Sequence, residues 1–144
     1  MAFDIDQRYR IKRNSEQEEQ MRYLVNDLKL FKSLSQLLVV SAVIGFINGK
    51  SRPFDKNAEP VLMNSFSERS YDMMNFIAYA EKKEQSVLKD GKQYQFFEAF
   101  ANGGFPILLE KLNINFIDKA KNDRNALLLK YYSLLVNNGF YLDE

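Results

Sequence analysis

An apolar run in the first half of the chain, residues 37–47, constrains the fold more than any other feature. It spans about eleven residues, roughly half of what a membrane-spanning helix requires. Ser33 and Gln36 precede it with the spacing of a capping box, and Gly49 follows as a helix stop. Because apolar side chains would lie on every face, we expect residues 34–48 to form a buried central helix.

The composition is typical of one helical domain. The chain has 144 residues, 46% hydrophobic and 14% aromatic, which is enough for one core, and no linker divides it. We therefore expect a single domain over residues 1–144, mainly α, with about six helices around the central one and a short N-terminal strand. The other expected helices cover residues 16–28, 67–83 (capped by Ser67 or Ser70), 92–101, 106–112 and 115–137.

Local signals place the breaks between these helices. The turn Asn102-Gly103-Gly104 is expected to end one helix, and Pro106 to open the next at its first position. Residues 51–59, with Pro53 and Pro60 near the two ends, are expected to form an irregular loop. Asn138-Gly139 is expected to close the last helix as a left-handed cap.

Charge and missing residue types exclude several classes of function. The chain has 20 Lys plus Arg against 19 Asp plus Glu, so its total charge favours no class of partner. It contains neither cysteine nor histidine, which excludes disulfides, thiolate nucleophiles, zinc-thiolate sites and imidazole catalysis. The absence of cysteine fits a reducing compartment, and the charged N-terminus lacks a signal-peptide pattern. We expect a cytoplasmic protein with no membrane contact.

Carboxylates are the remaining candidates for catalysis or metal binding. Those considered are Glu16, Glu18, Glu19, Asp118 and Asp123, all at expected helix starts or on polar faces, where solvated charge is the ordinary explanation. Neither Gly103-Gly104 nor Gly49-Lys50-Ser51 has the spacing of a phosphate-binding P-loop. We expect no catalytic residue, no metal and no cofactor.

A basic segment at the N-terminus is the clearest local signal for binding. Residues 7–13 (QRYRIKR) alternate as a short strand does. One side would carry Arg8, Arg10 and Lys12, and the other Tyr9, Ile11 and Arg13. Alternatively, this segment is a solvated arm or the start of the next helix, with its charges exposed.

The order of strand, helix and helix over residues 7–48 resembles ribbon-helix-helix DNA-binding proteins. The resemblance implies a homodimer in which strands of two copies pair and place Arg8, Arg10 and Lys12 in the major groove. It also implies that Lys32 and Ser33, at the start of the second helix, hold a DNA phosphate. The long C-terminal half departs from the simple members of that class.

Two stretches resemble the bacterial family called Dnd system-associated protein four, encoded beside the DNA phosphorothioation machinery. They are residues 31–55 (FKSLSQLLVVSAVIGFINGKSRPFD) and residues 96–112 (FFEAFANGGFPILLEKL). The resemblance covers about two thirds of the chain and leaves out residues 1–15 and the part after residue 112. It implies a place in phosphorothioation-linked restriction and antiviral defence, with other proteins of that system as partners, and it carries no catalytic residues.

Three functions compete on these observations. The preferred one is a non-catalytic accessory protein that binds DNA or regulates the defence system. The second is a protein-protein adaptor that docks a larger defence protein through an aromatic face. The residues of this face would be Tyr94, Phe96, Phe97, Phe100 and Phe105. The alternative explanation of these aromatic side chains is that they are buried in the protein's own core. The third is a metal-dependent enzyme that uses carboxylates such as Glu18 or Asp118.

Overall fold

The computed structural model describes residues 6–88 and 91–137. Within them the chain forms five α-helices and a two-stranded antiparallel sheet, so it is mainly α, as expected. The elements run in the order β1 (Arg10–Ile11), α1 (Glu18–Arg22), α2 (Leu34–Ile47), β2 (Val61–Leu62), α3 (Glu68–Lys82), α4 (Lys92–Leu112) and α5 (Arg124–Asn137). A π-helical turn, η2 (Tyr23–Asp27), continues α1.

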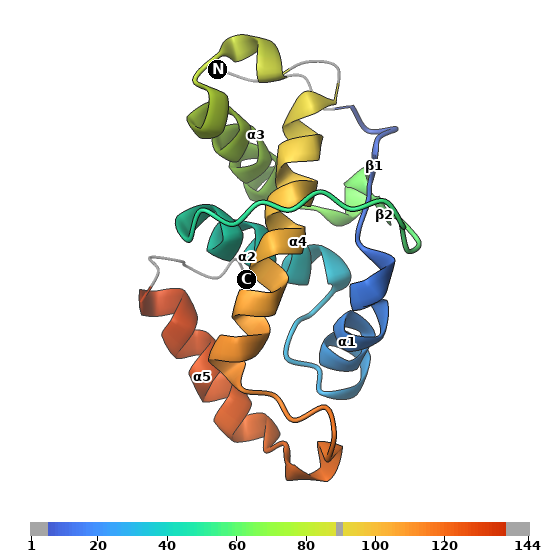
Figure 1. Cartoon of the computed structure of the whole chain (residues 1–144), viewed down its shortest axis with the longest axis vertical. Helices are drawn as coiled ribbons and strands as arrows, with labels where there is room; N and C mark the ends of the chain where they lie inside the picture. Colours follow the sequence, from blue (N-terminus) through green and yellow to red (C-terminus); the bar gives the residue numbers. More distant parts are fainter. Residues whose placement is uncertain (1–5, 89–90, 138–144) are drawn as a thin grey trace.

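The centre of the molecule is the crossing of α2 and α4, the two helices that pack most extensively on each other. Figure 1 shows α4 along the long axis, with α3 beside one half of it and α5 beside the other. Nine residues of α2 are buried, on all sides of the helix, which confirms the predicted central helix. The predicted cap at Ser33 is also confirmed, since its side chain accepts a hydrogen bond from the backbone N–H of Gln36.

The helix α4 corrects the prediction of two helices separated at Asn102-Gly103-Gly104, because it continues through these residues. The glycines serve close packing instead of a turn. A Cβ at Gly104 would overlap the carbonyl oxygen of Ser41 in α2, and a Cβ at Gly103 would overlap that of Lys50. A Cβ at Gly45 of α2 would likewise overlap the carbonyl oxygen of Phe100 in α4. Only glycines therefore allow the backbones of the two helices to come this close.

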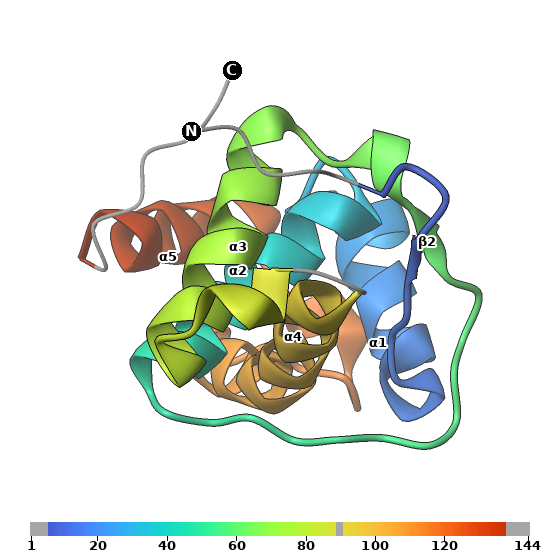
Figure 2. The same cartoon turned by 90° about the horizontal axis from the view of Figure 1, so that it is seen from above.

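Pro106 lies inside α4 and not at the first position of a new helix. A proline has no N–H, so the carbonyl oxygen of Asn102, four residues earlier, receives no helical hydrogen bond from it. The side-chain Nε2 of Gln17 donates to that oxygen over 3.1 Å. The Asn102 side chain in turn donates to the carbonyl of Arg52 over 2.9 Å and joins the irregular segment after α2 to α4. This segment crosses α4 in Figure 1 and runs along the edge of the molecule in Figure 2.

The short strand β1 pairs with β2 of the same chain, with Arg10 opposite Leu62 and Ile11 opposite Val61. The elements β1, α1 and α2 follow one another in the order of strand, helix and helix expected over residues 7–48, although β1 is only two residues long. A ribbon-helix-helix protein pairs this strand with a second copy. In this structure β1 instead pairs along one edge with β2 of its own chain.

The last helix begins at Arg124, nine residues later than the predicted start at residue 115. The Asn122 side chain holds the intervening segment as a loop, because it accepts a hydrogen bond from the backbone N–H of Asn115 and donates one to the Asn115 carbonyl. Such local bonds compete with a helix. Ile117, expected on the apolar stripe, is fully exposed, whereas Leu127, Tyr131 and Leu135 are buried as expected. The predicted cap at Asn138-Gly139 lies outside the described residues.

Candidate functional site

Three cations predicted to bind DNA lie on or beside the two-stranded β1–β2 ribbon, with Arg10 in β1 and Arg8 and Lys12 flanking it in the chain. Arg8, Arg10 and Lys12 are exposed, while Ile11 between them is buried. The predicted alternation is therefore confirmed. The Nε of Arg8 lies 3.6 Å from an oxygen of Asp6, and both side chains are at least half exposed, so this ion pair neutralises little charge.

A buried carboxylate holds β1 against α4. Glu98 is 6% exposed and accepts hydrogen bonds from the backbone N–H of Lys12 (2.6 Å) and the hydroxyl of Tyr9 (3.1 Å). Burial raises the pKa of Glu98 to about 7, although both hydrogen bonds act in the opposite direction. Burial and the nearby Glu98 charge also raise the pKa of Tyr9. The backbone of Lys12 is thereby fixed while its side chain remains in solvent.

A second ionic group lies behind the ribbon. Arg13, 2% exposed, donates to Glu18 through its guanidinium and to the carbonyl of Glu59 over 2.9 Å. Burial alone would raise the pKa of Glu18, but hydrogen bonds from Arg13 and then Arg22 outweigh it and lower the pKa. Glu18, a candidate for carboxylate chemistry, therefore takes part in an ion pair that anchors the N-terminal segment.

Lys32 and Ser33 lie apart from the ribbon, at the start of α2. The hydroxyl of Ser33 accepts from Gln36 N over 3.2 Å, and the Gln36 side chain accepts from Lys32 N over 2.8 Å. These two bonds cap the helix, and the Lys32 side chain is exposed. The structure thus separates the five predicted residues into three on the ribbon and two at the helix start.

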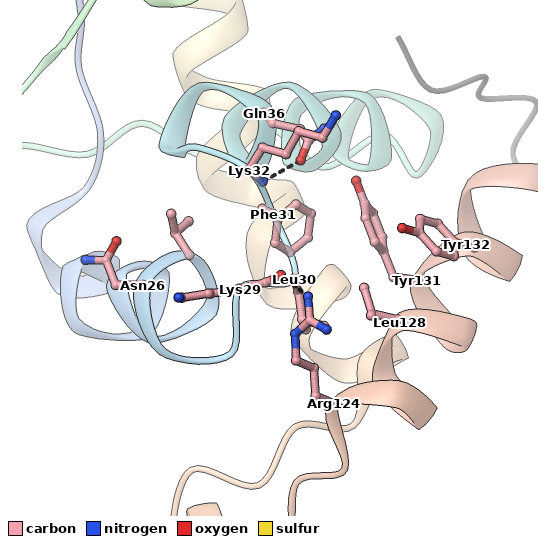
Figure 3. A pocket seen from close by; sticks show the side chains of 11 residues that line it. Asn26, Lys29, Leu30, Phe31, Lys32, Gln36, Arg124, Leu128, Tyr131 and Tyr132 are labelled. Carbon is pink, nitrogen blue, oxygen red and sulfur yellow. Dashed lines mark hydrogen bonds between the residues drawn. The ribbon is translucent and has the colours of Figure 1, made fainter. Parts of the chain in front are cut away.

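A pocket of about 750 Å³ adjoins Lys32, between η2, the start of α2 and α5 (Figure 3). Lys29 and Arg124 line it together with Lys32, but Arg8, Arg10 and Lys12 do not. Arg124 donates to the carbonyl oxygens of Leu28 (2.8 Å) and Lys29 (3.1 Å). These partners lie about a hundred positions away in the sequence, so no local pattern pointed to this group.

Comparison with known proteins places the chain in a family. The family model described as DNA sulphur modification system-associated protein 4 matches residues 10–133. The chain belongs to this family. The sequence resemblance left out residues 1–15 and the part after residue 112, whereas the match reaches into both and includes β1, β2 and the residues that line the pocket. Neither the search of curated proteins nor the search of solved structures found a match.

The protein is therefore associated with a DNA sulphur modification system. The aromatic face proposed as a docking surface does not lie at the surface of the described chain. Its rings are buried or half-buried in the core: Tyr94, Phe96, Phe97, Phe100 and Phe105. Their neighbours explain the burial, since Phe97 packs edge-on against Phe66 and Phe100 against Phe46.

Exposed apolar side chains lie on other helices. On α5 they are Leu129, Tyr132 and Val136, which follow the i, i+3, i+7 spacing of one helix face. On α3, Phe76 and Tyr79 are exposed. An adaptor surface would therefore lie on α3 or α5 and not on α4.

The carboxylates considered for catalysis or metal binding are dispersed. Asp118 lies 4.0 Å from Lys121, and Asp123 accepts from the N–H of Asn125 at the start of α5. Within residues 6–88 and 91–137, no three acidic side chains gather where they could hold a metal ion. In the same residues, no helix has the length and apolar character needed to cross a bilayer.

Proposed function

We propose that the protein is a non-catalytic accessory component of its DNA sulphur modification system and binds DNA through the β1–β2 ribbon. The observation that carries this proposal is the exposure of three cations at the ribbon, Arg10 in β1 and Arg8 and Lys12 on either side of it. Basic side chains on the outer face of a two-stranded ribbon suit phosphate contacts and entry into a groove. The buried side of the ribbon, with Ile11 and Val61, fixes the direction of these cations.

A duplex-binding titration tests this function. Fluorescence anisotropy of a labelled DNA duplex measures affinity at several salt concentrations between about 50 mM and 200 mM. The variant R8A/R10A/K12A is expected to bind more weakly, and the slope of log affinity against log salt is expected to fall by about 0.9 for each lost phosphate contact.

The matched control removes the same charge elsewhere. The variant K92A/K111A/K130A also loses three exposed cations, none of them on the ribbon or in the pocket. It is expected to retain most of the affinity. Equal losses in both triple variants, or no loss in the ribbon variant, would contradict ribbon binding. Sedimentation of the free and DNA-bound protein tests the homodimer predicted from the sequence.

A protein-protein adaptor is the second candidate, favoured by the exposed stripe of Leu129, Tyr132 and Val136 on α5. Such a stripe can be the apolar side of a helix that docks in a partner's groove. The occupant would be another protein of the sulphur modification system. Co-purification of another protein of that system from cells that carry the whole system, lost in L129K/V136K but retained in R8A/R10A/K12A, would support the adaptor over the DNA-binding protein.

A further inference from the structure

The pocket beside Lys32 has the electrostatic character of an anion site. Three of its lining residues, Lys29, Lys32 and Arg124, carry positive charge, and among residues 6–88 and 91–137 no Asp or Glu lines it. The hydrogen bonds of Arg124 go to the neutral carbonyls of Leu28 and Lys29, which orient the guanidinium without cancelling its charge. The pocket is therefore net cationic by composition.

The start of α2 adds to this potential. This helix has 14 residues, and the pocket is lined by Gln36 in its first turn and by Lys32 just before its N-cap, Ser33. The aligned peptide dipoles of a helix favour negative charge at this end. Figure 3 shows Lys32 and Gln36 on one side of the pocket and Arg124 on another.

An unpartnered hydroxyl in the wall points to a ligand independently of charge. Tyr131 is 2% exposed and lines the pocket, and within the described part of the chain its hydroxyl has no hydrogen-bond partner. Figure 3 shows this hydroxyl directed toward the first turns of α2. A buried donor without an acceptor is costly, so an oxygen supplied by a ligand would satisfy it.

The aromatic wall and the volume indicate more than a bare anion. Tyr132 stacks on Tyr131 with ring centroids 5.7 Å apart, and it is 45% exposed. An exposed ring at the edge of a cationic site is a surface on which a nucleobase stacks. A pocket of about 750 Å³ is also in the size range of sites for whole small molecules.

We propose that this pocket binds a nucleotide through its phosphate, either as a free nucleotide or as the phosphorylated end of a DNA strand. Lys29, Lys32 and Arg124 contact the phosphate, Tyr131 donates to a ligand oxygen, and Tyr132 stacks on the base. The site is distinct from the β1–β2 ribbon and does not depend on DNA binding there, since none of these five residues belongs to β1 or β2.

Calorimetric titration of the full chain tests the site. The free probes are thymidine 5′-monophosphate, thymidine and inorganic phosphate. The strand probes are a short oligothymidine with a 5′-phosphate and the same strand with a 5′-hydroxyl. We expect saturable binding of the monophosphate, no binding of thymidine, and binding of inorganic phosphate weaker by about tenfold because base stacking is lost.

Substitutions inside and outside the pocket distinguish binding at this site from a general effect of positive charge. K29Q and K32Q are each expected to weaken monophosphate binding about tenfold, as loss of a charge-assisted hydrogen bond does. K111Q removes an exposed cation outside the pocket and is expected to change nothing. Y131F is expected to weaken binding without lowering the melting temperature, because the removed hydroxyl has no partner among the described residues. R8A/R10A/K12A is expected to keep full affinity for the monophosphate.

Two results support the site and identify the source of its ligand. Binding of the free monophosphate but of neither strand identifies a free nucleotide. Binding of the strand only when it carries the 5′-phosphate identifies a DNA end. The proposal is overturned if neither the free monophosphate nor the 5′-phosphorylated strand gives saturable binding, or if inorganic phosphate binds as tightly as the nucleotide. It is also overturned if K29Q and K32Q bind the monophosphate as tightly as K111Q does. Failure of the ribbon variant to lose duplex affinity leaves these outcomes unaffected.

Discussion

The side chain of Gln17 donates a hydrogen bond to the backbone carbonyl of Asn102 in the middle of α4, over 3.1 Å. This carbonyl would otherwise have no helical partner, since Pro106 stands four residues later. A residue from the N-terminal segment thus replaces a missing backbone donor in the central helix, and the two parts of the chain are joined at a buried point.

Removal of this donor is expected to destabilise the fold. Q17A leaves the Asn102 oxygen unpaired and should lower the free energy of unfolding by about 1 to 3 kcal/mol. In a P106A background the loss should shrink, because alanine restores the N–H at position 106. Chemical denaturation of the two single variants and the double variant measures this coupling, and additive effects would show that the two residues do not share the carbonyl.

The glycine packing between α2 and α4 provides a second prediction. G104A places a Cβ into the backbone of Ser41, so it should destabilise the protein by about 2 kcal/mol or more. G49A is the matched control. Gly49 has a positive φ of 65° but open space around its Cβ position, so it should cost only about 1 kcal/mol of backbone strain. Equal losses would indicate that close approach is not the reason for Gly104.

The difference between α2 and α4 shows how far the sequence predicts this fold. The helix α2 was predictable because apolar residues on all sides and a capping pair are local signals. In α4, Gly103, Gly104 and Pro106 are also local signals, and they indicate a break. Tertiary contacts overrule them, since α2 needs the glycines for close packing and Gln17 compensates for the proline. These partners are distant in sequence, so no window along the chain contains both.

The two candidate sites also differ in how far the sequence predicts them. Alternation within residues 7–13 was enough to predict that Arg8, Arg10 and Lys12 face outward, which the structure confirms. The strand β2, which pairs with β1, is too short to leave a sequence pattern. The pocket joins Lys29 and Lys32 to Arg124 from the other end of the chain. Arg124 could be noticed in sequence only as a polar residue among apolar ones.

The raised pKa of Glu98 predicts a specific dependence of stability on pH. Its pKa is about 7 in the folded chain and 4.5 ordinarily, so the folded state binds this proton more tightly. The stabilisation is fully present below about pH 4.5 and is lost as pH rises through about 7. We expect the free energy of unfolding to fall over this window by at most about 3 kcal/mol.

Denaturation of E98Q and of the unaltered protein at several pH values measures the effect. Glutamine does not titrate, so the decline between about pH 4.5 and 7 should largely disappear in E98Q. The lowered pKa of Glu18 acts in the opposite sense and removes stability only as pH falls below its ordinary value of 4.5. An equal decline in both proteins over the upper window would assign it to another group.

Lys29 links backbone strain to the pocket and provides the last prediction. It adopts a left-handed conformation with φ of 54°, which favours glycine, and its side chain lines the pocket. K29G should therefore raise the free energy of unfolding by up to about 1 kcal/mol while it weakens binding of thymidine 5′-monophosphate. Lys83 is the matched control, since it has φ of 58° at the end of α3 and does not line the pocket. K83G should give the same gain in stability with unchanged nucleotide affinity. A loss of affinity in K83G equal to that in K29G would show that the effect comes from stability and not from the Lys29 charge.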